Sequence, residues 1–130
     1  MEKINEKNEM IYSNKISDSK NGYTILADGE YNEHEFKIIS YGSHPCCYVK
    51  LNPDEKYYGK AKDEIPLLCH GGVSFAMVVE NDDRFENGFW IGWDYAHYGD
   101  AWGTAIHGRM YTTQMLIADV KETIDELNTV

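Results

Sequence analysis

The chain has 130 residues and a mass of 15.0 kDa, which is the size of a single folded domain. Hydrophobic residues make up 42% and charged residues 26% of it, which excludes a wholly disordered or fibrous chain. A net charge of -10 disfavours direct binding to nucleic acid, because the phosphate backbone would repel the protein.

The sequence has no sign of a membrane or secretion segment. Its apolar runs fall short of the roughly 18 residues that a membrane-spanning helix needs, and residues 1–7 lack the apolar stretch of a signal peptide. We therefore expect a soluble, cytoplasmic protein with no membrane partner. The odd number of cysteines (Cys46, Cys47 and Cys69) argues against a disulfide scaffold, and reduced thiols are expected.

The first half of the chain predicts strands after a polar start. Residues 1–20 are rich in Lys, Glu, Asn and Ser and predict a flexible or loosely attached segment, followed by a single domain over 21–130. Residues 23–27 and 36–41 are β-prone, and Asp28-Gly29 is a turn signal between them, so a hairpin is expected.

The middle of the chain alternates strands with loops. Residues 47–51 predict a third strand, and the dense glycine and proline of 54–72 predict a shaped loop. Residues 73–79 and 89–93 predict two buried strands that pair as a hairpin through the polar stretch between them. A second glycine-rich loop follows, over 94–108.

The chain ends in a predicted amphipathic helix, with Thr112 or Thr113 available to cap its start. Its apolar residues recur at spacings of three and four: Leu116, Ile117, Val120, Ile124 and Leu127. These elements predict an α+β fold, in which a mostly antiparallel β-sheet carries the C-terminal helix on one face.

Two loops flank the predicted 73–79 and 89–93 hairpin. If these strands pair, the loop before residue 73 and the loop after residue 93 meet at one edge of the sheet. His70 would then face Asp94, His97 and Asp100.

Three interpretations of this cluster remain open. The aspartates and histidines can form a structural hydrogen-bond network within tight loops. The same four residues can hold a divalent metal such as Zn, Fe or Mn. One histidine, oriented by an aspartate, can act as a catalytic acid or base in a pocket for a small molecule.

Aromatic residues and glycines crowd the same loops and favour a ligand. Rings in glycine-rich loops suit stacking on a nucleobase, and Tyr95, Tyr98 and Trp102 are expected to face the surface. Adjacent glycines can offer backbone N–H groups to a phosphate. The candidate ligand-binding residues are Gly71, Gly72, Trp93, Tyr95, Tyr98, Trp102 and Arg109.

Several ordered segments resemble a family of uncharacterised small proteins found in phages, prophages and bacterial genomes. The segments are Tyr57-Tyr58-Gly59-Lys60, Glu64-Ile65-Pro66, His70-Gly71-Gly72-Val73-Ser74-Phe75 and Trp90-Ile91-Gly92-Trp93-Asp94-Tyr95-Ala96-His97-Tyr98-Gly99-Asp100. The resemblance covers about residues 47–127 and implies an accessory role such as counter-defence. Members often carry cysteine where this chain has Tyr95, so no indispensable thiolate is implied there.

Three functions follow as hypotheses, each with its own partner. The first is binding of a small, nucleotide-like ligand between the two glycine-rich loops. The second is an anti-CRISPR-like inhibitor, whose acidic helix face and 28–35 loop dock on the basic groove of a host nucleic-acid-binding enzyme. The third is a metal-dependent hydrolase that uses His70, Asp94, His97 and Asp100. Apart from that metal no cofactor is expected, and the oligomeric state stays open.

Overall fold

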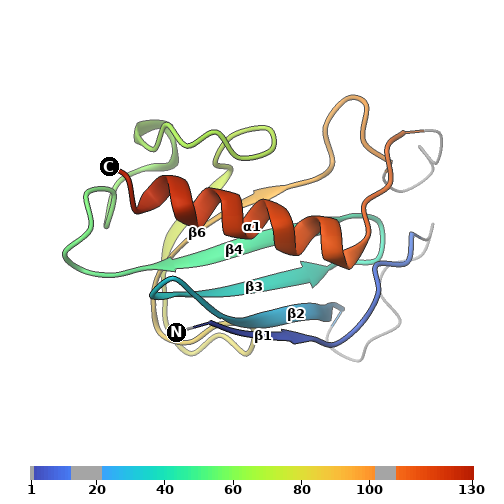
Figure 1. The fold of residues 1–130 in the computed structure, drawn as a ribbon, viewed down its shortest axis with the longest axis horizontal. Helices are drawn as coiled ribbons and strands as arrows, with labels where there is room; N and C mark the ends of the chain where they lie inside the picture. Colours follow the sequence, from blue (N-terminus) through green and yellow to red (C-terminus); the bar gives the residue numbers. More distant parts are fainter. Residues whose placement is uncertain (1, 13–21, 102–107) are drawn as a thin grey trace.

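The structure, a computed structural model, describes residues 2–12, 22–101 and 108–130. Its six strands form one antiparallel sheet in the order β1-β2-β3-β4-β6-β5, and one helix, α1, lies across a face of the sheet (Figure 1). This is the predicted α+β fold. The elements are β1 (Lys3–Glu6), β2 (Thr24–Tyr31), β3 (His34–Ser40), β4 (Pro45–Leu51), the 3-10 turn η1 (Lys62–Glu64), β5 (Phe75–Val79), β6 (Gly88–Asp94) and α1 (Thr113–Leu127).

β2 and β3 form the predicted hairpin, but the expected turn at 28–29 is wrong. Asp28 and Gly29 continue β2 and pair with residues of β3. The chain reverses at Asn32 and Glu33, whose φ angles of 48° and 72° are left-handed. Gly29 is required for another reason, because a Cβ there would lie 1.8 Å from the backbone oxygen of Lys3 in the neighbouring strand.

Part of the N-terminal segment belongs to the sheet, which corrects the expectation of a flexible or loosely attached start for residues 3–10. β1 pairs antiparallel with β2 as an edge strand. Met10 is buried, and its N–H donates to Oγ1 of Thr113 at 3.0 Å. β1 is not predicted from the sequence because Ile4 is its only apolar residue, so no alternation marks it. Residues 13–20 lie outside the described ranges.

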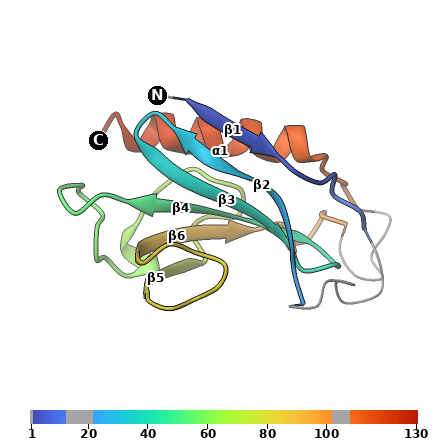
Figure 2. The same ribbon diagram turned by 90° about the horizontal axis from the view of Figure 1, so that it is seen from below.

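The C-terminal helix is confirmed. The Thr112 side chain, one of the two predicted caps, accepts the N–H of Met115 at 3.2 Å. The predicted apolar residues all turn toward the sheet, and Thr113 and Thr123 are buried with them. The sheet and α1 therefore enclose the larger core of the molecule (Figure 2).

The sheet separates two apolar clusters and the adjacent cysteines with them. Cys47 belongs to the larger cluster under α1, whereas Cys46 lies on the opposite face with Phe85 and Trp90. Burial raises the pKa of the Cys46 thiol to about 12, and the pKa of Cys47 is also raised. Both cysteines and Cys69 are free, as predicted.

The β5–β6 hairpin is also confirmed, and it places the candidate site. The expected burial of both strands holds for β6 but is wrong for β5, which is an edge strand in which only Val79 is buried. Val79 pairs with Gly88 next to the connecting loop, and Phe75 pairs with Gly92 at the other end. Since antiparallel partners start and end beside each other, the segment entering β5 and the segment leaving β6 lie at the same end of the sheet.

Candidate functional site

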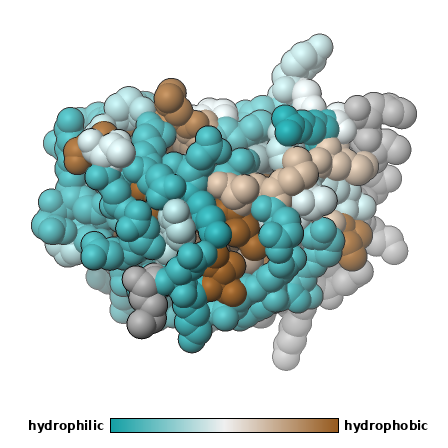
Figure 3. Space-filling model, in the orientation of Figure 1, coloured by the Kyte–Doolittle hydropathy of each residue, from teal (hydrophilic) through white to brown (hydrophobic). Residues whose placement is uncertain are grey.

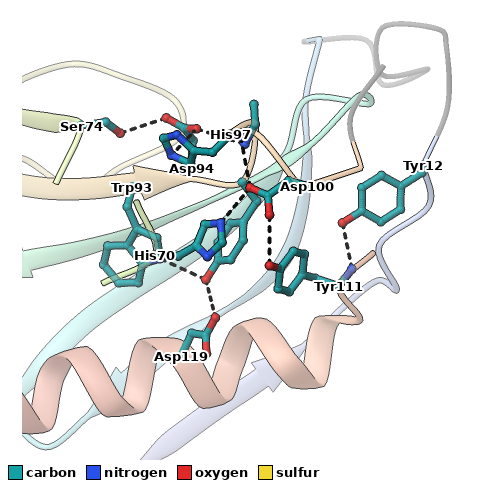
Figure 4. Close-up of polar contacts among 11 residues, drawn as sticks. Tyr12, His70, Ser74, Trp93, Asp94, His97, Asp100, Tyr111 and Asp119 are labelled. Carbon is teal, nitrogen blue, oxygen red and sulfur yellow. Dashed lines mark hydrogen bonds and ion pairs between the residues drawn. The ribbon is translucent and has the colours of Figure 1, made fainter. Parts of the chain in front are cut away.

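The segments around residues 70 and 97 converge, as the predicted hairpin requires. The ring centroids of His70 and His97 are 5.7 Å apart. Each ring lies beside a carboxylate: Nε2 of His70 is 2.7 Å from Oδ2 of Asp100, and Nε2 of His97 is 3.2 Å from Oδ1 of Asp94 (Figure 4). All four residues of the predicted cluster are thus brought together.

Asp100 is the buried centre of the cluster. Its side chain is 4% exposed, and its carboxylate accepts from three donors: Nε2 of His70, the backbone N–H of His97 at 3.1 Å and the hydroxyl of Tyr111 at 3.1 Å. Burial by itself would raise the pKa of Asp100, but these donors together hold that pKa below its ordinary value. Asp100 therefore remains an acceptor at neutral pH.

The ionised state of Asp100 fixes the role of each nitrogen of His70. A carboxylate only accepts, so the hydrogen of a neutral His70 ring lies on Nε2 and the lone pair lies on Nδ1. The ring also stacks on Tyr95, with centroids 4.5 Å apart and planes 12° apart. His70 is thereby oriented on two sides, and its Nδ1 can accept a proton or a hydrogen bond.

The second pair, Asp94 and His97, behaves as a structural contact. Asp94 accepts from the N–H of Ala96 at 3.1 Å and from the hydroxyl of Ser74 at 3.1 Å. Nε2 of His97 is buried beside Asp94 without a well-directed hydrogen bond, and it packs so closely on Gly71 that a Cβ there would lie 2.3 Å away. For this pair the geometry favours the structural interpretation.

In the described part of the chain, the four residues of the cluster are not arranged as a metal-binding group. Each histidine is engaged by its own aspartate, and the described residues contain no group of three or more His, Cys, Asp or Glu placed to hold a metal ion. The metal interpretation of His70, His97, Asp94 and Asp100 thus has no support from the geometry of the described chain.

The aromatic residues are not arranged as predicted. Tyr95, expected from the sequence to face the surface, is fully buried, and Trp93 is 1% exposed. The Trp93 indole N–H donates to the Tyr95 hydroxyl at 3.1 Å, and that hydroxyl donates to Asp119 of α1 at 2.7 Å. Neither ring can stack on a ligand without unpacking the core. Tyr98 is fully exposed, as expected, and Trp102 lies outside the described residues.

The paired glycines form a turn rather than an open phosphate cradle. Gly71 and Gly72 have positive φ angles of 71° and 81°. The N–H of Gly72 already donates to the carbonyl of Cys69 at 2.9 Å, so it is not free for a phosphate. The turn directly follows His70, which lies beside Asp100.

A cleft of about 430 Å³ lies between α1 and the 68–70 segment. Of the candidate residues from the sequence, His70 and Arg109 line it, while His97, Tyr98, Gly71 and Gly72 do not. The other lining residues are not predicted from the sequence, since polar positions on the helix indicate only solvent exposure. They are Leu68, Cys69, Tyr111, Met115, Asp119, Glu122, Thr123 and Glu126.

The lining of the cleft carries charges of both signs. Asp119, Glu122 and Glu126 project from α1, and the Glu126 carboxylate accepts the N–H of Leu68 at 3.0 Å. Arg109 supplies the positive group, and its guanidinium lies 5.1 Å from the centre of the Tyr111 ring. A ligand with both hydrogen-bond donors and an anionic group would match this lining.

No activated nucleophile accompanies His70 among the described neighbours. Burial raises the pKa of the Cys69 thiol to about 12, so this cysteine is a protonated thiol at neutral pH. The hydroxyl of Ser74 donates to Asp94 and not to a histidine, so no imidazole base is placed to accept its proton. The arrangement can bind a polar group or accept a proton through His70, but it does not form a covalent catalytic triad.

Comparison of the chain with protein-family models, curated proteins and solved structures found no match. In the described part of the chain, no helix has the length and apolar character needed to cross a membrane. The function is therefore inferred from the site itself.

Proposed function

We propose that the chain binds a small, nucleotide-like molecule in the cleft between α1 and the 68–70 segment, with His70 as its central polar contact. The observation that carries the proposal is the fixed orientation of the His70 imidazole. Asp100 and Tyr95 hold the ring in place, yet the His70 side chain is 29% exposed and lines the cleft. An oriented polar group in a concave site is typical of ligand recognition.

The size and charge of the cleft support a ligand of this class. A volume of about 430 Å³ falls within the range of small-molecule sites. The anionic end of a mononucleotide would pair with Arg109, and the amino group of its base would donate to Glu122. The balance of charge favours a ligand with one phosphate over a ligand with several, because three carboxylates line the cleft together with a single arginine.

A binding role explains the geometry better than an acidic docking surface does. Several carboxylates of that predicted surface are engaged within the protein. Asp125 accepts from the Tyr31 hydroxyl at 3.0 Å, and Glu126 accepts the N–H of Leu68. Asp28 and Glu35 form ion pairs with lysines at 3.0 and 3.2 Å. These carboxylates already have partners within the protein and are therefore less available to a partner protein.

Isothermal titration with adenosine, AMP, cyclic nucleotides and ADP-ribose tests the proposal. We expect AMP-like ligands to bind, and a His70→Phe variant, which keeps a flat ring beside Tyr95, to bind at least about tenfold more weakly. Tyr98→Ala is the matched control, since Tyr98 is an exposed ring outside the cleft and its loss should leave affinity unchanged.

Two results would overturn the proposal: no binding of any of these ligands by folded protein, or equal binding by the wild type and His70→Phe. Binding should persist in a chelator, and loss of binding there would favour the metal-dependent alternative instead.

In the phage or prophage setting that the resemblance implies, such binding would withdraw a nucleotide signal from the host.

A further inference from the structure

Strand β5 is an edge of the sheet, and it is built differently from the opposite edge. Within the described residues β5 pairs with β6 alone, so its outer backbone groups face away from the sheet. The other edge, β1, begins with Lys3 and ends with Glu6, and such charges discourage further strand pairing. β5 has the sequence FAMVV, without a charge or a proline.

The exposed side chains of β5 make this edge apolar. Met77 is 56% and Val78 64% exposed, although neighbouring residues of a strand point to opposite faces. Both faces are therefore open at this point of the edge. Val78 pairs with Phe89, whose ring lies 5.3 Å from that of the exposed Tyr58, so a third apolar side chain is nearby. Isolated exposed apolar residues are ordinary, but an uncharged edge strand that carries them is a pairing site.

We propose that β5 pairs antiparallel with β5 of a second copy of this chain, about a twofold axis at Met77. In this register Phe75 lies opposite Val79 and Ala76 opposite Val78, so every pair within the strand is apolar. The next pair would be Ser74 opposite Glu80, so the first carboxylate beyond the strand lies opposite a serine and not opposite Glu80 of the other copy. The pairing closes on itself, joining the two sheets into one.

The sequence of the strand favours a second copy over a charged peptide. β5 offers no charge that could select an acidic or a basic partner, whereas a second copy supplies an apolar, uncharged strand of the same length. The net charge of -10 on each copy opposes association, and the strand is short, so the dimer should be weak. Salt screens that repulsion, so higher ionic strength should strengthen this dimer, whereas it would weaken binding to a basic partner.

Sedimentation velocity of the full chain over a wide range of protein concentration, at low and at high NaCl, tests the proposal. We expect the dimer fraction to rise with protein concentration and with salt. Met77→Lys should abolish the dimer, because each copy would place an ammonium group at the axis. Met110→Lys is the matched control: Met110 is 51% exposed but lies outside β5, so the dimer should persist.

Val78→Lys serves as a second variant should Met77→Lys lose its native circular dichroism spectrum. Amide exchange at high protein concentration gives an independent readout, with slower exchange expected within Phe75–Val79. A wild type that is monomeric at every concentration and salt level overturns the proposal, as does a dimer that both lysine variants retain. β5 contains no residue that lines the cleft, so these outcomes are separate from the fate of the proposed function.

Discussion

Asp100 acts on three parts of the chain through a single carboxylate. It orients His70, holds the N–H of His97 in its own loop, and accepts from Tyr111 ahead of α1. Burial raises the pKa of Tyr111 to about 12, with Asp100 adding to the effect, so Tyr111 stays a donor at neutral pH. Asp100 is thus a positioning residue, which fixes His70 without itself being among the residues that line the cleft.

The lowered pKa of Asp100 predicts a pH-dependent loss of stability. The folded state favours the carboxylate, so its stabilisation is fully present above the ordinary aspartate pKa of about 3.9 and is lost as the pH falls through the lower folded value. Asp100→Asn should have a lower unfolding free energy than the wild type at neutral pH. This difference in unfolding free energy should become smaller below about pH 4.

Urea unfolding at a series of pH values measures this gap. Asp63→Asn is the control, because Asp63 is exposed and its substitution should change the unfolding free energy little. A gap between the wild type and Asp100→Asn that stays constant from neutral to acid pH would contradict the assignment.

Gly71 and Gly72 allow a paired test of the close packing at the site. Both have positive φ angles, so alanine is strained at either, but only at Gly71 would the new Cβ meet the His97 ring. We expect Gly72→Ala to cost about 1 kcal/mol and Gly71→Ala about 2 to 4 kcal/mol of unfolding free energy. Chemical denaturation measures both, and equal losses would show that His97 moves aside without cost.

At the scale of elements, the β2–β3 turn contains a residue that does not suit its backbone conformation. Its two turn residues, Asn32 and Glu33, are both left-handed, and the second position of such a turn favours glycine. The long side chain of Glu33 is therefore an unfavourable choice that the surrounding sheet tolerates.

Glu33→Gly should raise the unfolding free energy by about 0.5 to 1 kcal/mol, because the relief of backbone strain exceeds the added entropy of the unfolded chain. Lys37→Gly is the control, since Lys37 lies within the regular part of β3 and should be destabilised by glycine. Thermal or urea unfolding decides the sign, and a loss of stability in Glu33→Gly would refute the strain argument.

The pattern of apolar residues predicts α1 and the β5–β6 hairpin but misses β1. α1 is predicted because its apolar residues repeat at spacings of three and four, and the hairpin is predicted because two apolar runs are joined by a polar stretch. The turn at 28–29 is misplaced because Gly29 looks like a turn residue, although it is needed for the approach of Lys3. A glycine in the sequence indicates that the backbone has a special requirement at that position, but it does not distinguish a turn from a close approach of another strand.

The candidate site can be predicted in its polar centre but not in its surroundings. The His70 and Asp100 pair follows from strand pairing, which spacing can indicate. The burial of Tyr95 is missed, although extending the alternation of Ile91 and Trp93 by one step would place it on the same core face. The cleft depends on how α1 docks, and no local pattern contains that information.

At the scale of the whole molecule, an excess of acidic groups covers a stable apolar interior. The chain has 22 acidic and 12 basic residues, and the surface in the view of Figure 3 is mostly hydrophilic. Ion pairs such as Lys7 with Asp28 offset individual carboxylates, but the acidic groups in excess remain and repel one another in the compact state.

Raising NaCl should therefore raise the unfolding temperature of the chain at low protein concentration, because salt screens repulsion that is greater in the folded state. A double variant, Glu64→Gln with Glu80→Gln, removes two exposed charges and should respond less steeply. Scanning calorimetry measures both slopes. An unfolding temperature that falls as NaCl increases would mean that the ion pairs outweigh the net charge.

The bonds from Trp93 through Tyr95 to Asp119 give the protein a built-in optical reporter. The indole is shielded from water, yet only one hydroxyl separates it from a carboxylate on the wall of the cleft. A molecule that engages Asp119 will shift the electric field at the indole and so alter its emission. Occupancy of the cleft can then be followed by intrinsic fluorescence, without a dye, a tag or a labelled compound.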